Sequence, residues 1–315
     1  MPTHVLIDTD PGVDDALALL VALNSHELEI QAITTVCGNV DVHTATSNLC
    51  TVLELVPGPH PVLAKGANRP LVREPFFANH VHGTNGLGGT TTVQNAAATA
   101  SLSEREAYAE IGHQINISVE PLTLITLGPL TNIALALERD PKLADNVAEM
   151  IMMGGAYLGP GNITPAAEFN IFADPQAADR VFRSGIPLTA VGLDVTRQVR
   201  LDRETLNAWV HTSGSPARQK VQEWTEHSLN YMQDLNGHAS IPLHDPLAVL
   251  VAMQPGLVQT QSMHVQVETQ GEVTQGMTLA DRRPILDRWK KASNIQVCTH
   301  VHSRQSLNRF LEGIP

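Results

Sequence analysis

Short apolar runs typical of β-strands alternate with helix-like segments over the first two thirds of the chain. In α/β proteins this alternation comes from right-handed strand–helix–strand units, which build a parallel sheet with helices on its faces. The sequence therefore predicts a mostly parallel central sheet flanked by helices, of the open Rossmann-like α/β class. Many α/β enzymes of 315 residues are one compact unit, so we expect a single domain over residues 1–315. The expected strands are residues 5–7, 29–35, 61–64, 122–127, 147–153 and 187–193, and the clearest helices are residues 16–23, 42–55 and 130–138.

Two segments interrupt this alternation. Residues 66–99 are rich in Gly, Asn and Thr and predict a long active-site lid loop, because loops of this length inside compact domains are usually functional. Residues 217–236 have helical spacing, and with the turn that follows they predict a second active-site helix and loop over residues 217–245. The remaining pattern predicts extra carboxyl-terminal strands at residues 264–269, 275–280 and 294–300 and a final helix at residues 305–311.

The composition excludes several classes of protein. A formal net charge of −12 without a Lys/Arg cluster disfavours nucleic-acid binding, which depends on contacts to phosphates. The cysteines Cys37, Cys50 and Cys298 lack CxxC spacing, so we expect reduced core thiols rather than disulfides or a zinc site. No basic leader and no apolar run of bilayer length is present, which predicts a soluble, cytoplasmic protein without a membrane partner.

Four aspartates lie within eight residues at the end of the first expected strand: Asp8, Asp10, Asp14 and Asp15. They surround a Pro-Gly turn that leads into the first helix, and in open α/β sheets ligands bind at the carboxyl ends of strands. Carboxylates this close repel one another and raise each other's pKa unless a cation neutralises them. Hard oxygen ligands favour Ca²⁺ or Mg²⁺ over softer metals. The cluster therefore predicts a metal site.

Two other interpretations account for part of the cluster. Capping of the first helix by Asp10 or Asp14 explains one or two of the carboxylates. Asp8 and Asp10 also have the DxD spacing of phosphatases that form an aspartyl-phosphate, an interpretation that gives Asp14 and Asp15 no role. Metal binding accounts for more of the cluster than either alternative.

Residues 8–16, which contain the four aspartates, resemble the DTDPGxDDA signature of the calcium-dependent inosine-uridine preferring nucleoside hydrolase family. Further blocks follow in the order found in that family, and the likeness extends from about residue 3 to 250, with weaker likeness beyond. Six ordered blocks are far more specific than a lone DxD. The blocks are Cys37-Gly38-Asn39, Leu127-Gly128-Pro129-Leu130-Thr131-Asn132, Met153-Gly154-Gly155, Asn162 with Ala167-Glu168-Phe169-Asn170, Asp174-Pro175 and His244-Asp245-Pro246.

The resemblance implies a ribonucleoside hydrolase that uses Ca²⁺ and assembles as a homotetramer or homodimer. It assigns the calcium ion to Asp10, Asp15, Asp245 and the backbone carbonyl of Leu127. It assigns ribose and other substrate contacts to Asp14, Asn39, Met153, Asn162, Glu168 and Asn170. The pattern is compatible with this role, because Glu168 and Asn170 would point to one side of an extended segment.

At the base end, the resemblance suggests His244 as the acid that protonates the leaving base, with His82 on the lid as a second candidate. Tyr231 is a candidate base contact on the expected helix, together with Trp224 and His227. Pyrimidine nucleosides or inosine are the favoured substrates, because a histidine rather than an aromatic residue precedes the expected ligand Asp245. Around Asn85 and Gly88 the lid departs from the family pattern, which leaves the choice of base open.

The expected reaction is hydrolysis of the N-glycosidic bond by a water molecule that calcium and Asp10 activate, with inversion at the anomeric carbon. Such a reaction builds positive charge on the ribose and negative charge on the base. A nucleoside- or ribose-binding protein without turnover is an alternative from a different class. Asp10 and His244 favour the enzyme, because binding alone requires neither a base nor an acid.

Overall fold

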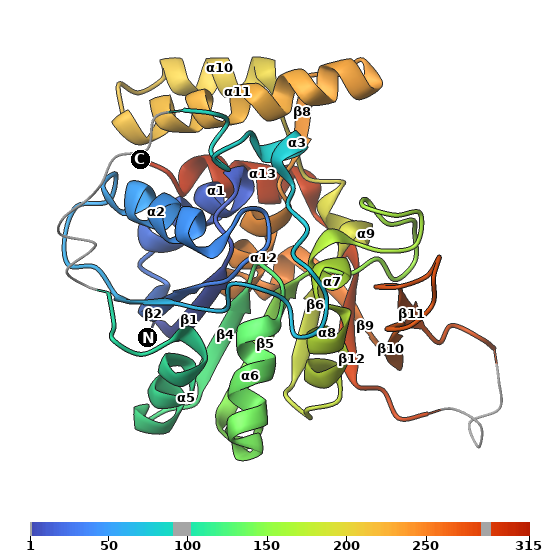
Figure 1. The fold of residues 1–315 in the computed structure, drawn as a ribbon. Helices are drawn as coiled ribbons and strands as arrows, with labels where there is room; N and C mark the ends of the chain where they lie inside the picture. The colour runs from blue at the N-terminus through green and yellow to red at the C-terminus, as the bar shows by residue number, and fades with distance from the viewer. Residues whose placement is uncertain (1, 91–101, 285–290) are drawn as a thin grey trace.

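The structure, a computed structural model, describes residues 2–90, 102–284 and 291–315. Eight of its strands form one sheet: β1 (Thr3–Thr9), β2 (Leu28–Thr35), β3 (Val62–Lys65), β4 (Leu122–Thr126), β5 (Val147–Met153), β6 (Leu188–Val191), β9 (Val258–Met263) and β12 (Ile295–Val301). Their order across the sheet is β3-β2-β1-β4-β5-β6-β12-β9 (Figure 1). Neighbouring strands are parallel except for β9, which pairs antiparallel with β12 at one edge. The mostly parallel sheet predicted from the sequence is confirmed.

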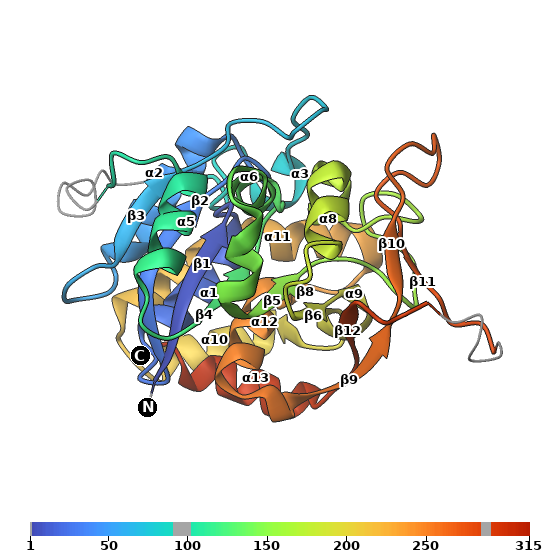
Figure 2. The same ribbon diagram turned by 90° about the horizontal axis from the view of Figure 1, so that it is seen from below.

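Helices cover both faces of the sheet (Figure 2). The helices of the described residues are α1 (Val13–Leu23), α2 (Val42–Leu53), α3 (Asn79–His82), α5 (Ala107–Ile117), α6 (Thr131–Arg139), α7 (Phe169–Ala173), α8 (Pro175–Phe182), α9 (Leu193–Thr196), α10 (Arg203–His211), α11 (Pro216–Asn236), α12 (His244–Met253) and α13 (Ser303–Glu312). Two 3₁₀ helices, η1 (Pro141–Asn146) and η2 (Pro255–Leu257), accompany them.

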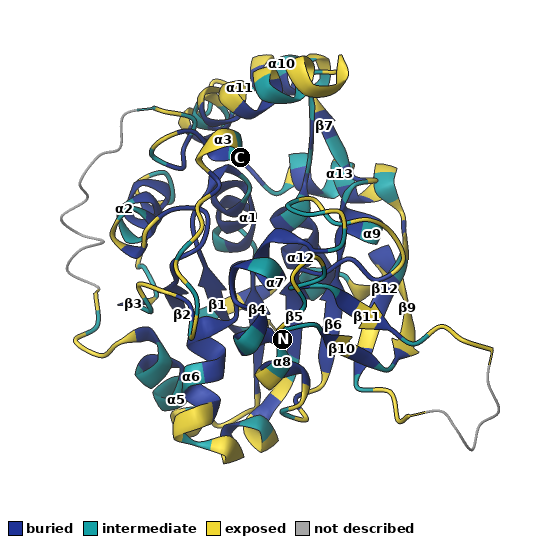
Figure 3. Cartoon of the chain, turned by 45° about the vertical axis from the view of Figure 1, so that its right-hand side comes forward, coloured by how far each residue is buried: buried dark blue, intermediate teal, exposed yellow. Residues whose placement is uncertain are grey.

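The hydrophobic core is divided by the sheet into two clusters, because successive side chains of a strand point to opposite faces. Val5 and Ile7 of β1 pack into the cluster that includes residues of α1, α2, α12 and α13. Leu6 packs into the other cluster, with residues of α5, α6 and α8. The strands are therefore apolar throughout rather than alternating, as expected for a parallel sheet covered on both sides. Figure 3 shows the central strands as mostly buried.

Two small antiparallel sheets lie outside the central one. The pair β7 (Arg200–Asp202) and β8 (Ser240–Pro242) joins the chain after α9 to the segment that enters α12. The pair β10 (Val265–Val267) and β11 (Thr278–Ala280) corresponds to the two strands expected at residues 264–269 and 275–280. The strand expected at residues 294–300 is β12, which joins the central sheet.

Several elements differ from the sequence prediction. The edge strand β9 and the helix α5 were not predicted, and the expected lid contains the short helix α3. Residues 91–99 of that lid lie outside the described residues. The three cysteines are free and buried, as expected. Across residues 2–90, 102–284 and 291–315, no helix is long and apolar enough to cross a membrane.

Candidate functional site

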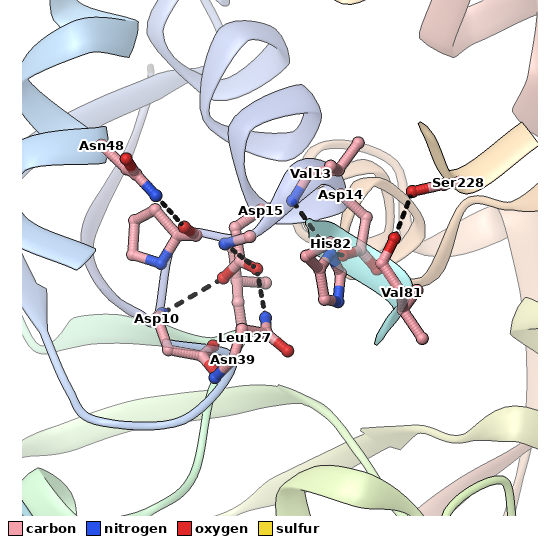
Figure 4. Close-up of polar contacts among 12 residues, drawn as sticks. Asp10, Val13, Asp14, Asp15, Asn39, Asn48, Val81, His82, Leu127 and Ser228 are labelled. Carbon is pink, nitrogen blue, oxygen red and sulfur yellow. Dashed lines mark hydrogen bonds and ion pairs between the residues drawn. The ribbon is translucent and has the colours of Figure 1, made fainter. Parts of the chain in front are cut away.

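A cavity of about 490 Å³ lies where the carboxyl ends of the central strands meet α3, α11 and the start of α12. Most of the expected site residues line it, although they come from distant parts of the sequence. They are Asp14, Asn39, His82, Leu127, Met153, Asn162, Glu168, Asn170, Tyr231, His244 and Asp245. Asp10 and Asp15 lie buried at its base rather than among the lining residues, and Figure 4 shows both beside Asn39 and Leu127.

The turn after β1 separates the four aspartates into different environments. Asp8 is fully buried and accepts hydrogen bonds from the Thr34 hydroxyl at 2.5 Å and the Asn132 amide at 2.8 Å. Burial raises the pKa of Asp8 to about 7, against the opposing effect of these hydrogen bonds. Asp8 therefore connects β1 to its neighbours and does not face the cavity.

Asp10 is held between two glycines. Its Oδ2 accepts a hydrogen bond from the backbone N–H of Asn39 at 2.6 Å, whereas Oδ1 has no hydrogen-bond partner among the described residues. A Cβ atom added at Gly38 would lie 2.0 Å from Oδ2, and one added at Gly128 would lie 2.5 Å from Oδ1. Only residues without a side chain leave room for this carboxylate. A bound cation is one partner that could satisfy a buried carboxylate oxygen of this kind.

Asp15 forms the contacts of a helix cap. It lies in the first turn of α1 and accepts the backbone N–H of Gly12 at 3.0 Å, so the capping role considered for Asp10 or Asp14 belongs to Asp15. It also accepts hydrogen bonds from the Thr9 hydroxyl at 2.6 Å, the Asp10 N–H at 3.2 Å and the Asn39 amide at 3.0 Å. These four donors hold both carboxylate oxygens toward the turn.

Three carboxylates form a group that can hold a metal ion. Asp14, Asp15 and Asp245 each offer an oxygen within 4.8 Å of the others. Burial and then the neighbouring carboxylates raise the pKa of Asp14 to about 7 and that of Asp245 well above its usual value. Burial followed by the Asp15 carboxylate likewise raises the pKa of Asp10. Because these causes all penalise negative charge, a bound cation would relieve the repulsion.

Backbone and amide groups complete the floor of the cavity. The carbonyl of Leu127 follows β4 and accepts a hydrogen bond from the Asn170 amide at 2.6 Å. The same amide lies 3.3 Å from the carbonyl oxygen of Met153 at the end of β5. The sheet thus brings the ends of β4 and β5 to one polar side chain, as expected from the sequence.

The segment that carries Glu168 and Asn170 is not extended, and the expected alternation was wrong. Glu168 is the N-cap of α7, and its carboxylate accepts the backbone N–H groups of Gly155, Asn170 and Ile171 at 2.8–3.1 Å. Burial raises the pKa of Glu168 despite these hydrogen bonds. The helix turn still places Glu168 and Asn170 on the cavity, together with the intervening Phe169.

Two histidines face the cavity from different elements. The Nδ1 atom of His82 in α3 accepts the backbone N–H of Val13 at 3.0 Å and lies 3.9 Å from the Asp14 carboxylate (Figure 4). The Nδ1 atom of His244 is 2.7 Å from the Thr196 hydroxyl. Burial lowers the pKa of His82 to about 4, and burial followed by Arg197, His82 and Arg200 lowers that of His244 to about 3. Both rings are therefore held in the neutral form.

A sequence model of the family described as inosine-uridine preferring nucleoside hydrolase matches residues 5–308. This chain belongs to that family. The nucleoside hydrolase is 40% identical to the pyrimidine-specific ribonucleoside hydrolase RihA of Shewanella baltica (strain OS155) over 294 residues, which cover 93% of this chain and 91% of the relative. It is also 40% identical to RihA of Escherichia coli O9:H4 (strain HS) over 282 residues, 89% of each chain.

Solved structures share the fold over the whole length of this nucleoside hydrolase. A purine-preferring ribonucleoside hydrolase from Gardnerella vaginalis has a TM-score of 0.90 at 32% identity, covering 99% of this chain and 98% of that chain. The plant nucleoside hydrolase PpNRh1 has a TM-score of 0.89 at 32% identity, covering 100% and 99%. The chain is thus an enzyme that cleaves N-glycosidic bonds, on a fold that family members with different base preferences share.

Not every residue that the sequence placed near the nucleobase lines the cavity of this nucleoside hydrolase. Tyr231 lines the cavity, and its ring lies 5.9 Å from that of His80. Trp224, by contrast, is fully buried in the core, and His227 is exposed, with its ring nitrogen 3.3 Å from the carbonyl oxygen of His80. Trp224 and His227 therefore do not line the cavity, because the helical turn points them away from it.

Asp194, in the first turn of α9 after β6, holds a neighbouring loop rather than the cavity. Its carboxylate accepts the backbone N–H groups of Tyr157, Leu158 and Gly159 at 2.8–3.0 Å and does not line the cavity. Sequence reasoning missed other cavity residues, among them Arg197, Arg200, Ser228 and Met232. Only the position of Arg197 shortly after an expected strand end offered a signal for any of them.

Proposed function

We propose that this nucleoside hydrolase binds Ca²⁺ through Asp10, Asp15, Asp245 and the carbonyl of Leu127. The observation that carries the proposal is the group of carboxylates formed by Asp14, Asp15 and Asp245, together with Oδ1 of Asp10, which is buried and unpartnered among the described residues. Oxygen-only donors of carboxylate and carbonyl type suit a hard cation of this size. For Asp15 to be a ligand, one of its oxygens must bind the ion in addition to the donors it already accepts.

The ion, when bound, supplies Lewis acidity that makes a nearby water more acidic. Asp10 is the proposed base that takes the proton from this water as it attacks the anomeric carbon of the ribose. The backbone N–H of Asn39 donates to Oδ2 and so holds the Asp10 carboxylate in one orientation, with Oδ1 unpartnered among the described residues. Attack from the side opposite the base leads to inversion.

The sugar end of the cavity is built from acceptors and amides. We assign the ribose hydroxyls to Asp14, Asn39 and Asn170, and the far end of the sugar to Asn162, Glu168 and the region of Met153. Asn162 already uses its amide oxygen to accept the Phe169 N–H at 2.9 Å, which leaves its NH₂ group for substrate. Buried carboxylates near the ribose favour the positive charge that develops there in the transition state.

The part of the cavity that we assign to the nucleobase is lined by His244, His82 and Tyr231. His244 is the proposed donor of a hydrogen bond from its neutral ring to the leaving base, where it stabilises the negative charge that develops there. His82 lies toward the ribose side of the cavity, 3.9 Å from the Asp14 carboxylate. We propose that pyrimidine nucleosides are favoured, since the RihA relatives at 40% identity are described as pyrimidine-specific. Inosine is the second candidate, because a purine-preferring enzyme shares the fold at 32% identity.

Two alternatives have less support. An aspartyl-phosphate phosphatase would need Asp8 as its nucleophile, yet Asp8 is fully buried against Thr34 and Asn132 and does not line the cavity. A nucleoside-binding protein without turnover would need neither Asp10 nor His244. The assembly as a homodimer or homotetramer, the single-domain organisation and the cytoplasmic location stay predictions from the sequence.

The decisive experiment measures ribose release from uridine, cytidine, inosine, guanosine, adenosine and p-nitrophenyl riboside. We expect turnover of uridine and cytidine to exceed that of adenosine and guanosine. Binding of nucleosides without release of ribose would support the binding-protein alternative and overturn the proposal. Release of phosphate from a phosphorylated substrate, with none of ribose, would favour the phosphatase.

A further inference from the structure

Thr196 is the last residue of α9 and forms a side-chain contact with His244. Its hydroxyl oxygen lies 2.7 Å from Nδ1 of the histidine ring, and Thr196 itself is fully buried. Among the described residues, this is the only hydrogen bond of the Thr196 side chain. A buried hydroxyl thus has the ring as its sole partner.

The contact is fixed from both sides by the backbone. On the Thr196 side, the backbone N–H groups of Val195 and Thr196 donate to the carbonyl of Gly192, and Asp194 anchors the same turn to residues 157–159. On the other side, the N–H of Leu243 donates to the carbonyl of Val199 at 2.8 Å. The pairing of β7 with β8 holds these two segments together. The Thr196–His244 distance is therefore set by the fold.

The hydroxyl and the ring have two possible arrangements when the ring is neutral. If Nδ1 carried the ring proton, it would donate to Thr196, and the hydroxyl proton would have no acceptor in a buried position. If Nε2 carries the proton, Thr196 donates to Nδ1, and both the hydroxyl and Nδ1 are satisfied. Buried polar groups without partners are costly, so the second arrangement is favoured. It leaves the N–H of Nε2 on the side of the ring away from Thr196.

We propose that Thr196 is a positioning residue that orients the His244 ring and places its proton on Nε2, the nitrogen available to the leaving base. This inference rests on the proposed role of His244 and extends it to a residue that does not line the cavity. The orientation of a histidine by a hydrogen bond at its second nitrogen decides which nitrogen can donate. Without the hydroxyl, the ring can also present Nε2 as an acceptor, which cannot help the base to leave.

The test compares Thr196→Val, which removes the hydroxyl but keeps the shape, with Thr196→Ser, which keeps the hydroxyl. For Thr196→Val we expect kcat on uridine to fall roughly 10-fold or more, because a preorganised hydrogen-bond donor to a group that becomes negative in the transition state contributes about 10²–10³-fold. Turnover of p-nitrophenyl riboside, whose leaving group needs no protonation, should stay close to wild type. Thr196→Ser should restore most of the uridine activity. The matched control is Thr225→Val, which deletes another fully buried hydroxyl, one that donates to the Val221 carbonyl and does not line the cavity.

A spectroscopic readout separates positioning from packing. In protein labelled with ¹⁵N-histidine, the His244 signals, assigned by their loss in His244→Ala, should show the Nε2–H tautomer in wild type and Thr196→Ser. In Thr196→Val they should show a mixture of tautomers. The Nδ1–H tautomer in wild type would overturn the inference, and so would equal losses on uridine and p-nitrophenyl riboside in Thr196→Val.

The effect of His244→Ala distinguishes a failure of the proposed role of His244 from a failure of the inference about Thr196. If His244→Ala affects uridine and p-nitrophenyl riboside equally, the proposed role of His244 fails. If His244→Ala is selective for uridine but Thr196→Val is not, only the inference about Thr196 fails.

Discussion

Removal of the metal should destabilise this enzyme more at pH 8 than at pH 5.5. The reason lies in the buried carboxylates at the base of the cavity, of which Asp14 has its pKa raised from 3.8 to about 7 by burial and by Asp15. A group whose pKa is raised on folding stabilises the fold while it is protonated. That contribution is complete below the unfolded pKa of 3.8 and is lost as the pH rises through about 7.

The size of the effect follows from this shift. Each pH unit between the two pKa values changes the free energy of unfolding by about 1.4 kcal/mol. The titration of Asp14 alone therefore changes the stability of the metal-free protein by about 4 kcal/mol over the full range, and by about 2 kcal/mol between pH 5.5 and pH 8. Asp14 is 15% exposed, so solvent screening reduces this only in part. For a chain of this length 1 kcal/mol changes Tm by about 2 °C, which predicts a difference of about 4 °C. Asp10 and Asp245 act in the same direction, because their pKa values are raised too.

The assay is thermal unfolding followed by circular dichroism, on metal-free protein with and without saturating CaCl₂. A fixed calcium concentration, equal to one hundred times the Kd at pH 5.5, contributes about 2.7 kcal/mol at that pH. At the same concentration the rise in Tm should be about 4 °C larger at pH 8, because the affinity for calcium is higher there. Asp14→Asn should remove most of this pH dependence, whereas Asp145→Asn, at an exposed position far from the cavity lining, should leave it intact. An equal or smaller calcium effect at pH 8 would show that repulsion among the buried carboxylates does not set the effect of the metal on stability.

Further predictions concern the chemistry of the cavity. Asp10→Asn keeps the size of the side chain but removes the base, and we expect kcat on uridine to fall by about 10²-fold or more while the circular dichroism spectrum is retained; near-normal turnover would exclude Asp10 as the base. Gly128→Ala places a Cβ 2.5 Å from Oδ1 of Asp10, so calcium affinity measured by titration calorimetry should fall, whereas Gly112→Ala, whose Cβ would meet only a Leu143 methyl at 3.5 Å, should not affect it. On 2′-deoxyuridine, kcat/KM should fall by roughly 5- to 150-fold relative to uridine, since an unpaired buried group costs about 1–3 kcal/mol; equal values would exclude a buried contact to the 2′-hydroxyl.

The sequence predicted the sheet because its central strands are apolar throughout and end in short polar motifs. Because the carboxyl ends of parallel strands lie at the same edge of a sheet, the sequence alone could place Asn39, Leu127 and Met153 near Asp14. All four line one cavity in the structure. The edge strand β9 was missed because four of its six residues are exposed and it lacks an apolar run.

The details of the site were harder to predict, because they depend on which partner each polar group finds. Nothing in the sequence distinguishes Asp15 as the capping carboxylate from Asp10 or Asp14, since all three lie at suitable spacing. Glu168 was placed on an extended segment, yet its side chain caps a helix turn that begins at the next residue. The contact between Thr196 and His244 spans 48 residues and arises only when β7 pairs with β8.

In the proposed mechanism, nucleoside cleavage depends on a cation held by the aspartate cluster. The most direct test titrates calcium into metal-free enzyme and follows ribose release from uridine at pH 8. We predict that turnover is negligible without calcium and rises to saturation with the same midpoint as the heat of calcium binding. Full turnover in the presence of excess chelator would contradict the claim.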